Sequence, residues 1–464
     1  MWCGVLAALL GPVCAGLAAE PERVGAPEPG PRPLSLNAAV CLALERNPEL
    51  AAMRQERGIA AAQVVIAETY PFNPSWENRV QQASGPFSAT ITNFVPLDQL
   101  VLLELEVRGQ GTYRRQGAYQ ALTRTEWEIA FHEQTFAVRA IRAFSNLLYR
   151  QEKLRLAERT IRLNQGLYDA TKPLRDAMKL TAADQLVLES EIAAARAAVG
   201  GARTSFETSR SDLRRALGVP DLAFEPVGSL ETSSIPTDGS TLTLVAFQRR
   251  ADLRAHQAAV AEAEAHLQLE IANRYGNPSF GPAFSYDPTR VSSIGAQVNI
   301  PLAVFNTHRG EIQQREAERT RAVLELRQTE EFVRLDVDAA LVRLRIAQER
   351  VETFRDRILP TLRKGLDNVR RLFLAGQGGA DVPRMLTLQR NELLAEDTYL
   401  DSLSELADAR ADLVAAVGDL SLAGIACPEP QAAATEPQAV ATEPQALAGA
   451  APSEDVETLP ALKP

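Results

Sequence analysis

The chain has 464 residues and a net charge of −10, and aromatic residues make up only 6% of it. The excess negative charge argues against a protein that binds nucleic acid by bulk electrostatic attraction. The abundance of Ala, Leu, Arg and Glu is typical of long helices and coiled coils rather than of an enzyme built around a sheet. The length predicts two to four ordinary domains or one long repeated architecture.

The N-terminus begins with an uncharged apolar run that ends in small residues, "MWCGVLAALLGPVCAGLAAE". This pattern predicts a signal peptide over residues 1–19 and export of the chain. Two alternatives stay open: a lipoprotein signal in which Cys14 is acylated, and a buried N-terminal helix, which Pro12 disfavours. No later segment has the roughly 18 consecutive apolar residues of a membrane-spanning helix.

Two segments have compositions that predict an absence of packed structure. Residues 20–34 are rich in Pro, Gly and Glu and are expected to form a tether. Residues 423–464 repeat the phrase "TEPQA" and contain few large apolar side chains, which predicts a disordered tail. The four cysteines are too few and too scattered to predict a disulfide framework, and no CxxC spacing indicates zinc.

Long intervals without proline mark the permitted helices, because a proline inside a helix costs about 3 kcal/mol. The stretch 310–373 would form a helix about 95 Å long at 1.5 Å per residue. A narrow apolar stripe with charged flanks runs along it, which predicts a coiled-coil seam. The stripe consists of Val337, Leu341, Leu344, Val351, Phe354, Ile358 and Leu362. Pro360 lies inside this stretch and predicts a kink there.

Two helical stretches end on nearly the same phrase, "RSDLRRALG" at Gly218 and "RADLVAAVG" at Gly418. A glycine in this place ends a helix by adopting a left-handed backbone conformation. Three further pairs of landmarks follow in the same order, about 200 residues apart: Leu50 with Leu253, Asn73-Pro74-Ser75 with Asn277-Pro278-Ser279, and Pro96 with Pro301. The chain is therefore predicted to be a duplicated unit, with repeats over 35–218 and 241–422 and a linker over 219–240.

Each repeat is predicted to contain a short helix, a strand pair (75–97 and 279–301), a long helix and a second helix. Alternation places apolar residues on one face of these strands. They are Phe280, Pro282, Phe284, Tyr286, Ile294, Ala296, Val298 and Ile300 in the second pair, and Phe87, Ala89, Ile91 and Val95 in the first. This pattern fits a lipid-facing barrel and fits a small soluble amphipathic sheet equally well. Two strand pairs cannot close a barrel, so insertion in a membrane would require several chains.

Taken together, these segments resemble the outer-membrane factor family, the TolC-like channels of efflux and type I secretion. The resemblance rests on "LSLNAAVCLALERNPELAA", "YPFNPS", "VNIPLAVFNTHRGEI", "ILPTLRKGLDNVRRLFLAGQGG" and "RNELLAEDTYLDSLSELADARADLVAAVG". It covers nearly the whole ordered chain. The "FNTHRGEI" that follows Pro301 leans toward the heavy-metal (CzcC-like) branch.

The resemblance implies a mainly α fold with a small β part, in which three copies form a long periplasmic α-barrel and a 12-stranded β-barrel in the outer membrane. It implies a homotrimer that contacts outer-membrane lipid, a periplasmic adaptor protein and an inner-membrane transporter. The implied function is the outer-membrane channel of a tripartite efflux system, which passes substrates from the periplasm to the exterior. Two alternatives stay open: an exported coiled-coil scaffold or adaptor without a pore, and an exit duct for type I protein secretion.

The resemblance also places the periplasmic entrance at two helix tips. It makes Asp184 and Asp381 the candidates for the aperture, and Met178, Gly376 and Arg384 the candidates for the tips and for adaptor docking. An acidic ring at a pore mouth attracts cations. A carboxylate in the first turn of a helix also satisfies free backbone amides. Both interpretations of Asp184 stay open.

No residue pattern predicts catalysis, a cofactor or a resident metal ion. The four histidines are His132, His256, His266 and His308, and no two of them are three or four residues apart, the spacing of a helical metal-binding pair. The sequence has no GxSxG motif and no Gly-rich phosphate loop. We therefore expect a protein that is not an enzyme and that binds no nucleic acid.

Overall fold

The structure is a computed structural model that describes residues 32–84, 93–176, 182–231, 238–287, 291–374 and 382–426. These residues belong to one unit, Met1–Cys427. The predicted signal peptide with Cys14, and nearly all of the predicted tail, lie outside the described residues.

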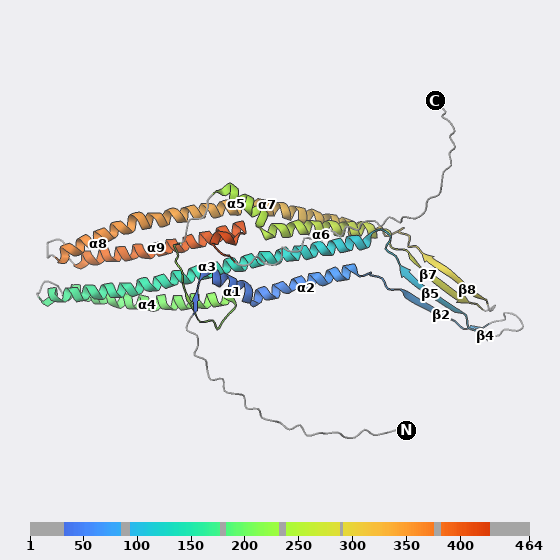
Figure 1. The fold of residues 1–464 in the computed structure, drawn as a ribbon, viewed down its shortest axis with the longest axis horizontal. Helices are drawn as coiled ribbons and strands as arrows, with labels where there is room; N and C mark the ends of the chain where they lie inside the picture. The colour runs from blue at the N-terminus through green and yellow to red at the C-terminus, as the bar shows by residue number, and fades with distance from the viewer. Residues whose placement is uncertain are drawn as a thin grey trace, which may run out of the picture. The chain divides into compact units, whose positions relative to one another are not determined.

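The two halves of the chain have the same order of elements (Figure 1). The first half contains α1 (Leu36–Arg46), α2 (Pro48–Glu68), β2 (Ser75–Val80), β5 (Leu97–Glu104), α3 (Gln110–Asp176) and α4 (Ala182–Leu217). The second contains α5 (Gly239–Arg249), α6 (Ala251–Asn273), β7 (Ser279–Tyr286), β8 (Ser292–Asn299), α7 (Arg309–Thr353), the π-helix η1 (Phe354–Ile358), α8 (Leu359–Leu374) and α9 (Val382–Val417). The returning helices α4 and α9 each have 36 residues. α4 packs against α3, and α9 packs against α8, α7 and α3.

The long helix of the second half changes its type just before Pro360, where the sequence predicts a kink. Residues 354–358 adopt the wider π-helical turn, which continues into α8. Proline has no N–H to donate and its ring crowds the preceding turn, and a π-bulge accommodates both effects. The bulge also shifts the apolar stripe by one position. Val337, Leu341, Leu344 and Val351 are buried as predicted, but beyond the bulge Leu359 is buried instead of Ile358.

The repeated sequence at residues 210–218 and 410–418 places the ends of α4 and α9 in one shared hydrophobic core. This core contains residues of α1, α3, α4, α5, α7 and α9. Leu213 and Leu217 of the first phrase, and Leu413 and Val417 of the second, all have 0% exposure. The phrase therefore supplies two buried apolar side chains, one helical turn apart, at the end of each returning helix.

Each phrase closes on a glycine that lies against a break in another helix. Gly218 and Gly418 have φ of 70° and 73°, in the left-handed region. A Cβ on Gly218 would lie 2.6 Å from Pro48 Cδ, and one on Gly418 would lie 3.3 Å from Arg250 Cα. The two positions therefore need glycine for its backbone conformation, and Gly218 also needs it for space.

The two helix breaks have the same geometry. Asn47 separates α1 from α2 with φ −67° and ψ 119°, and Arg250 separates α5 from α6 with φ −67° and ψ 120°. Asn47 Nδ2 donates to the carbonyl oxygen of Ala216 at 3.0 Å, and Arg250 Nη1 donates to that of Ala416 at 3.3 Å. Each break therefore satisfies a carbonyl in the last turn of a returning helix, which has no partner within its own helix.

Some residues that were predicted to be unstructured are packed. β1 (Arg32–Leu34), in the predicted tether, pairs in parallel with β6 (Phe224–Pro226), in the predicted linker. Leu34 and Phe224 are buried in the core, so hydrophobic burial outweighs the local proline content. Pro33 is tolerated because each strand of a two-stranded sheet has a free edge.

Structure also extends into the residues that were predicted as a tail from residue 423. The 3-10 helix η2 (Leu420–Ala423) is followed by Ile425, which is buried in the core. The sequence does not predict a disulfide either, but Cys41 of α1 is disulfide-bonded.

We expect Gly218→Ala to lower the melting temperature of the assembled protein. The new Cβ would overlap Pro48, and alanine is strained at this φ, at a cost of about 1–3 kcal/mol. Gly200→Ala, on the same helix, is the matched control, since nothing lies within 4 Å of a Cβ there. It should raise stability by about 0.5–1 kcal/mol. Thermal melts followed by circular dichroism compare the two, and equal melting temperatures would contradict this account of the glycine.

Candidate functional site

The longer strands of both halves join in one four-stranded antiparallel sheet with the order β2-β5-β7-β8 (Figure 1). β5 and β7 pair across the two halves, with Leu97 opposite Tyr286 and Leu103 opposite Phe280. Two short strands, β3 (Ala83–Ser84) and β4 (Asn93–Phe94), continue the first hairpin. Among the described strands, β2 and β8 each have one edge without a partner.

The first strand pair differs from its predicted bounds of 75–97. β5 begins at Leu97 and runs to Glu104. Most of the predicted strand Phe87–Val95 lies in residues 85–92, outside the described part of the chain. Pro96 precedes β5 whereas Pro301 follows β8, so these two prolines are not equivalent landmarks.

The strand register places most large apolar side chains on one face of the sheet. Residues directly opposite each other in antiparallel strands point to the same side. Trp76 lies opposite Val101, Phe284 opposite Ile294, and Phe280 opposite Val298. The apolar positions predicted for β7 and β8 therefore share a face. The opposite face carries mainly small or polar residues, among them Ser279, Ala283, Ser285, Ser293, Gly295, Gln297 and Asn299.

Within the described residues nothing covers this apolar face. Ile294 is 86% exposed and Trp76 is 66% exposed, and Phe280 and Val298 are also exposed. An exposed apolar patch of this kind marks an interaction surface. Eight-residue strands with one apolar and one polar face have the pattern of lipid-facing strands. In the described part of the chain, no helix is both long enough and apolar enough to span a membrane.

A polar network around the buried side chain of Gln110 joins the sheet to the helices. Gln110 is the first residue of α3 and is 1% exposed. Its Nε2 donates to Asn277 Oδ1 at 2.6 Å, and Asn277 Nδ2 donates to Glu104 Oε1 at 3.1 Å. Gln110 Oε1 accepts from the backbone N–H of Arg108 at 2.9 Å. The network joins the end of β5, the start of α3 and the segment that leads into β7.

The two helix tips lie between α3 and α4 and between α8 and α9. Met178, Gly376 and Asp381 fall in residues 177–181 and 375–381, outside the described residues. Asp184 is half-buried in the first turn of α4. Arg384 is exposed at the same position of α9, since each is the third residue of its helix. Equivalent positions at the two tips therefore carry opposite charges.

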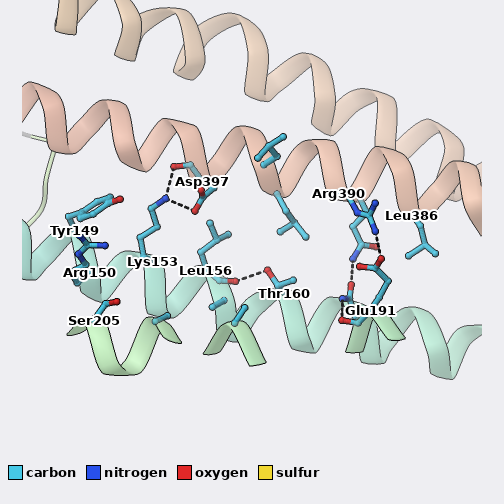
Figure 2. A pocket seen from close by; sticks show the side chains of 17 residues that line it. Tyr149, Arg150, Lys153, Leu156, Thr160, Glu191, Ser205, Leu386, Arg390 and Asp397 are labelled. Carbon is cyan, nitrogen blue, oxygen red and sulfur yellow. Dashed lines mark hydrogen bonds and ion pairs between the residues drawn. The ribbon is translucent and has the colours of Figure 1, made fainter. Parts of the chain in front are cut away.

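Between the tips and the hydrophobic core, polar contacts link α3 of the first half to α9 of the second. They border a groove of about 490 Å³ between α3, α4 and α9 (Figure 2). Lys153 Nζ lies 2.5 Å from Asp397 Oδ1 and 2.7 Å from Asp401 Oδ1. The hydroxyl of Tyr149 donates to Asp401 Oδ1 at 2.6 Å. One ammonium group is therefore shared by two carboxylates of the facing helix.

Further contacts between α3 and α9 lie closer to the tips. Arg159 Nη1 lies 2.9 Å from Glu396 Oε2, and Gln389 Nε2 donates to Asn164 Oδ1 at 2.8 Å. Both Asn164 and Gln389 are buried. A small apolar cluster follows toward the tips and consists of Leu167, Leu188 and Met385. No spacing in the sequence indicates these pairs, because their members come from helices that are distant in the chain.

Contacts within the Lys153 cluster shift the pKa values of Asp401 and Tyr149. Burial alone raises the pKa of Asp401, but hydrogen bonds from Lys153 and Tyr149 outweigh burial and lower the pKa below its usual value. Burial and the hydrogen bond to Asp401 raise the pKa of Tyr149. At neutral pH Lys153 and Asp401 are therefore charged and Tyr149 is neutral.

Three of the four histidines line one groove of about 680 Å³ between α3, α6 and α7: His132, His256 and His266. His266 Nε2 lies 3.7 Å from Glu262 Oε1, and the other oxygen of Glu262 lies 2.7 Å from Arg124 Nε. The sequence gives no sign of this grouping, because it joins α3 to α6. No set of three or more His, Cys, Asp or Glu in the described part of the chain is arranged to hold a metal ion.

We expect Lys153→Met to destabilise the contact between α3 and α9 by about 1–3 kcal/mol at neutral pH, because two carboxylates lose their shared donor. The lowered pKa of Asp401 gives a contribution to stability that is present above about pH 4 and is lost as the pH falls through the folded-state value. The variant should therefore lose less stability than the parent between about pH 5 and about pH 3. Melting curves across this range test it, with Lys364→Met, at an exposed position of α8, as the control. Parallel pH profiles for the parent and Lys153→Met would contradict the prediction.

The comparisons with known proteins agree with this architecture. The Outer membrane efflux protein family matches residues 244–419. A membrane protein from Pseudomonas aeruginosa is similar in structure, with a TM-score of 0.68 at 19% identity over 82% of this chain and 92% of that one. The Campylobacter jejuni CmeC outer membrane channel has a TM-score of 0.66 at 14% identity, over 82% and 85% of the two chains.

The open state of the Neisseria gonorrhoeae MtrE outer membrane channel has a TM-score of 0.63 at 17% identity, over 82% of this chain and 88% of that one. No curated protein matches the sequence. At these identities the structural likeness establishes the fold. This chain therefore has the fold of the outer-membrane channels, and most of its second half matches the Outer membrane efflux protein family.

Proposed function

We propose that this chain is the outer-membrane channel of a tripartite efflux system, which passes substrates from the periplasm to the exterior. The observation that carries the proposal is the four-stranded sheet, with its exposed apolar face and two unpaired edges, at one end of long helices. In lipid every backbone N–H and C=O must be paired. One copy of the sheet leaves two edges unpaired, so the membrane-inserted form needs other copies, with β8 of one copy beside β2 of the next.

Three copies would supply twelve strands, a number within the range of known membrane β-barrels. The helices of the trimer would enclose a periplasmic tube about 100 Å long, the length of the 67-residue α3. Exposed apolar side chains one or two helical turns apart support lateral contacts between copies. They are Ile59 and Ile66 on α2, and Leu335, Val342 and Ile346 on α7.

The tips would be the periplasmic entrance and would receive a periplasmic adaptor protein and, through it, an inner-membrane transporter. Met178, Gly376 and Arg384 are the docking candidates, and Asp184 and Asp381 are the aperture candidates. For the cargo we propose heavy-metal cations. The "FNTHRGEI" segment supports this.

The native mass in detergent tests the assembly. We expect a trimer, because three copies pair all strand edges. Mass spectrometry from detergent micelles measures this state, and fractionation of cells should place the chain with outer membranes. A monomer that stays soluble without detergent would exclude a membrane channel and favour an exported scaffold.

Channel recordings test the entrance. We expect Asp184→Asn to lower the cation preference of single-channel current, because it removes three carboxylates from a narrow opening. Asn is also a good residue near the start of a helix, so folding should be preserved. Arg384→Gln, at the equivalent position of α9, is the paired variant and should shift the preference in the opposite direction. Unchanged selectivity in Asp184→Asn would remove this residue from the pore.

A further inference from the structure

The segment between β8 and α7 carries a row of exposed apolar side chains. Phe305 is 101% exposed and Leu302 is 80% exposed, and Ile300 and Val304 are more than half exposed. None of these residues belongs to a strand or helix. Surface apolar residues that occur singly need no explanation, but a continuous row of this kind marks a contact surface.

This row continues the apolar face of the sheet. Ile294, Ala296 and Val298 lie on that face of β8, and Ile300, Leu302 and Val304 follow at the same spacing of two. β8 ends at Asn299, and the chain then turns, with the backbone N–H of Val304 donating to the carbonyl oxygen of Leu302 at 2.9 Å. The apolar residues after β8 therefore follow its apolar face directly in the chain without extending the strand.

A second aromatic residue lies beside this segment. Tyr275 is about half exposed and precedes Gly276, whose added Cβ would lie 2.8 Å from Pro301 Cγ. The guanidinium groups of Arg108 and Arg274 lie 4.4 Å and 5.3 Å from the centre of the Tyr275 ring. Aromatic rings with adjacent arginines are typical of the boundary between acyl chains and headgroups, where the cation meets phosphate.

The charges on the helix side of the segment fit the same partner. Arg309, the first residue of α7, is exposed and follows Phe305 closely in the chain. His308 Nδ1 lies 3.1 Å from Glu270 Oε1, and the exposed Glu311 lies in the same first turn of α7 as Arg309. The helix side of the row therefore carries both signs of charge, and the arginines among them can bind a lipid phosphate.

We propose that residues 300–305, together with Tyr275, form the lipid contact that borders the sheet on its helix side. Acyl chains pack against Ile300, Leu302 and Val304, Phe305 lies at the headgroup boundary, and arginine guanidinium groups bind lipid phosphates. This rests on the proposed function, and it defines which residues outside the strands the membrane covers. The competing occupant is a second copy of this chain, which the following experiment distinguishes.

The experiment uses single-tryptophan proteins in vesicles of phosphatidylcholine with brominated acyl chains, which quench tryptophan by contact. The parent has tryptophans at positions 2, 76 and 127. Trp2→Phe with Trp127→Phe leaves Trp76, on the apolar face of β2, as the reporter of the sheet. Adding Trp76→Phe and Phe305→Trp to that protein leaves a single tryptophan at position 305, which reports on the segment after β8. Phe332→Trp in the same background is the matched control, because Phe332 is an exposed phenylalanine of α7, about 35 Å along the helix axis from Arg309.

We expect brominated lipid to quench Trp76 and the tryptophan placed at position 305, and to leave the one at position 332 unquenched. If the tryptophan at position 305 has a blue-shifted emission but is not quenched, while Trp76 in its own protein is quenched, the segment contacts a second copy of the chain. This result would overturn the lipid contact and leave the proposed function standing. An unquenched Trp76 would overturn the proposed function itself. Each protein must show the native mass of the parent, and Leu302→Trp replaces Phe305→Trp if the latter does not assemble, with the same outcomes.

Discussion

The architecture depends on one repeated junction, in which a left-handed glycine at the end of a returning helix lies against the break in another helix. At Gly218 the neighbour is Asn47, and at Gly418 it is Arg250. Each break residue donates a hydrogen bond to a carbonyl two residues before the glycine. The junction ends the returning helix, satisfies an otherwise unpaired carbonyl in its last turn and sets where the neighbouring helix changes direction. Because it occurs in both halves, it gives them the same geometry despite different side chains.

The packing differs between the two ends of the helical hairpins. Near the junctions the helices share an apolar core that includes Phe144, Leu344 and Leu413. Toward the tips, α3 and α9 are joined largely through ion pairs and amide hydrogen bonds such as Lys153–Asp397 and Asn164–Gln389. Apolar burial stabilises without fixing direction. Polar contacts need defined geometry, and they lose much of their value when one partner is removed. The core therefore accounts for most of the stability, and the polar contacts determine how the two hairpins align.

The sheet places a different demand on the chain. Its apolar face and its two free edges are unsatisfied in a single copy. Burial of that face and pairing of those edges are separate requirements, because lipid provides the first and cannot provide the second. In the proposed channel, other copies of the chain in a lipid environment would meet both. The Gln110–Asn277–Glu104 network then holds the sheet to the start of α3, so that the position of the sheet follows that of the helices.

The sequence by itself determined the features that depend on local spacing: the long helices, the duplicated order of elements and the alternating face of β7 and β8. These follow from backbone sterics and from the periods of helix and strand, which act over a few residues. It did not predict that β1 pairs with β6 or that Ile425 is buried, because a partner far along the chain supplies the free energy in each case.

The candidate site divides in the same way. Asp184 and Arg384 could be located near the helix starts from the sequence, since helix ends have local signals. The Lys153–Asp397–Asp401 cluster and the grouping of His132, His256 and His266 were decided by the tertiary structure alone. Their members lie on different helices, and only the packing angle and register of those helices bring the side chains within reach.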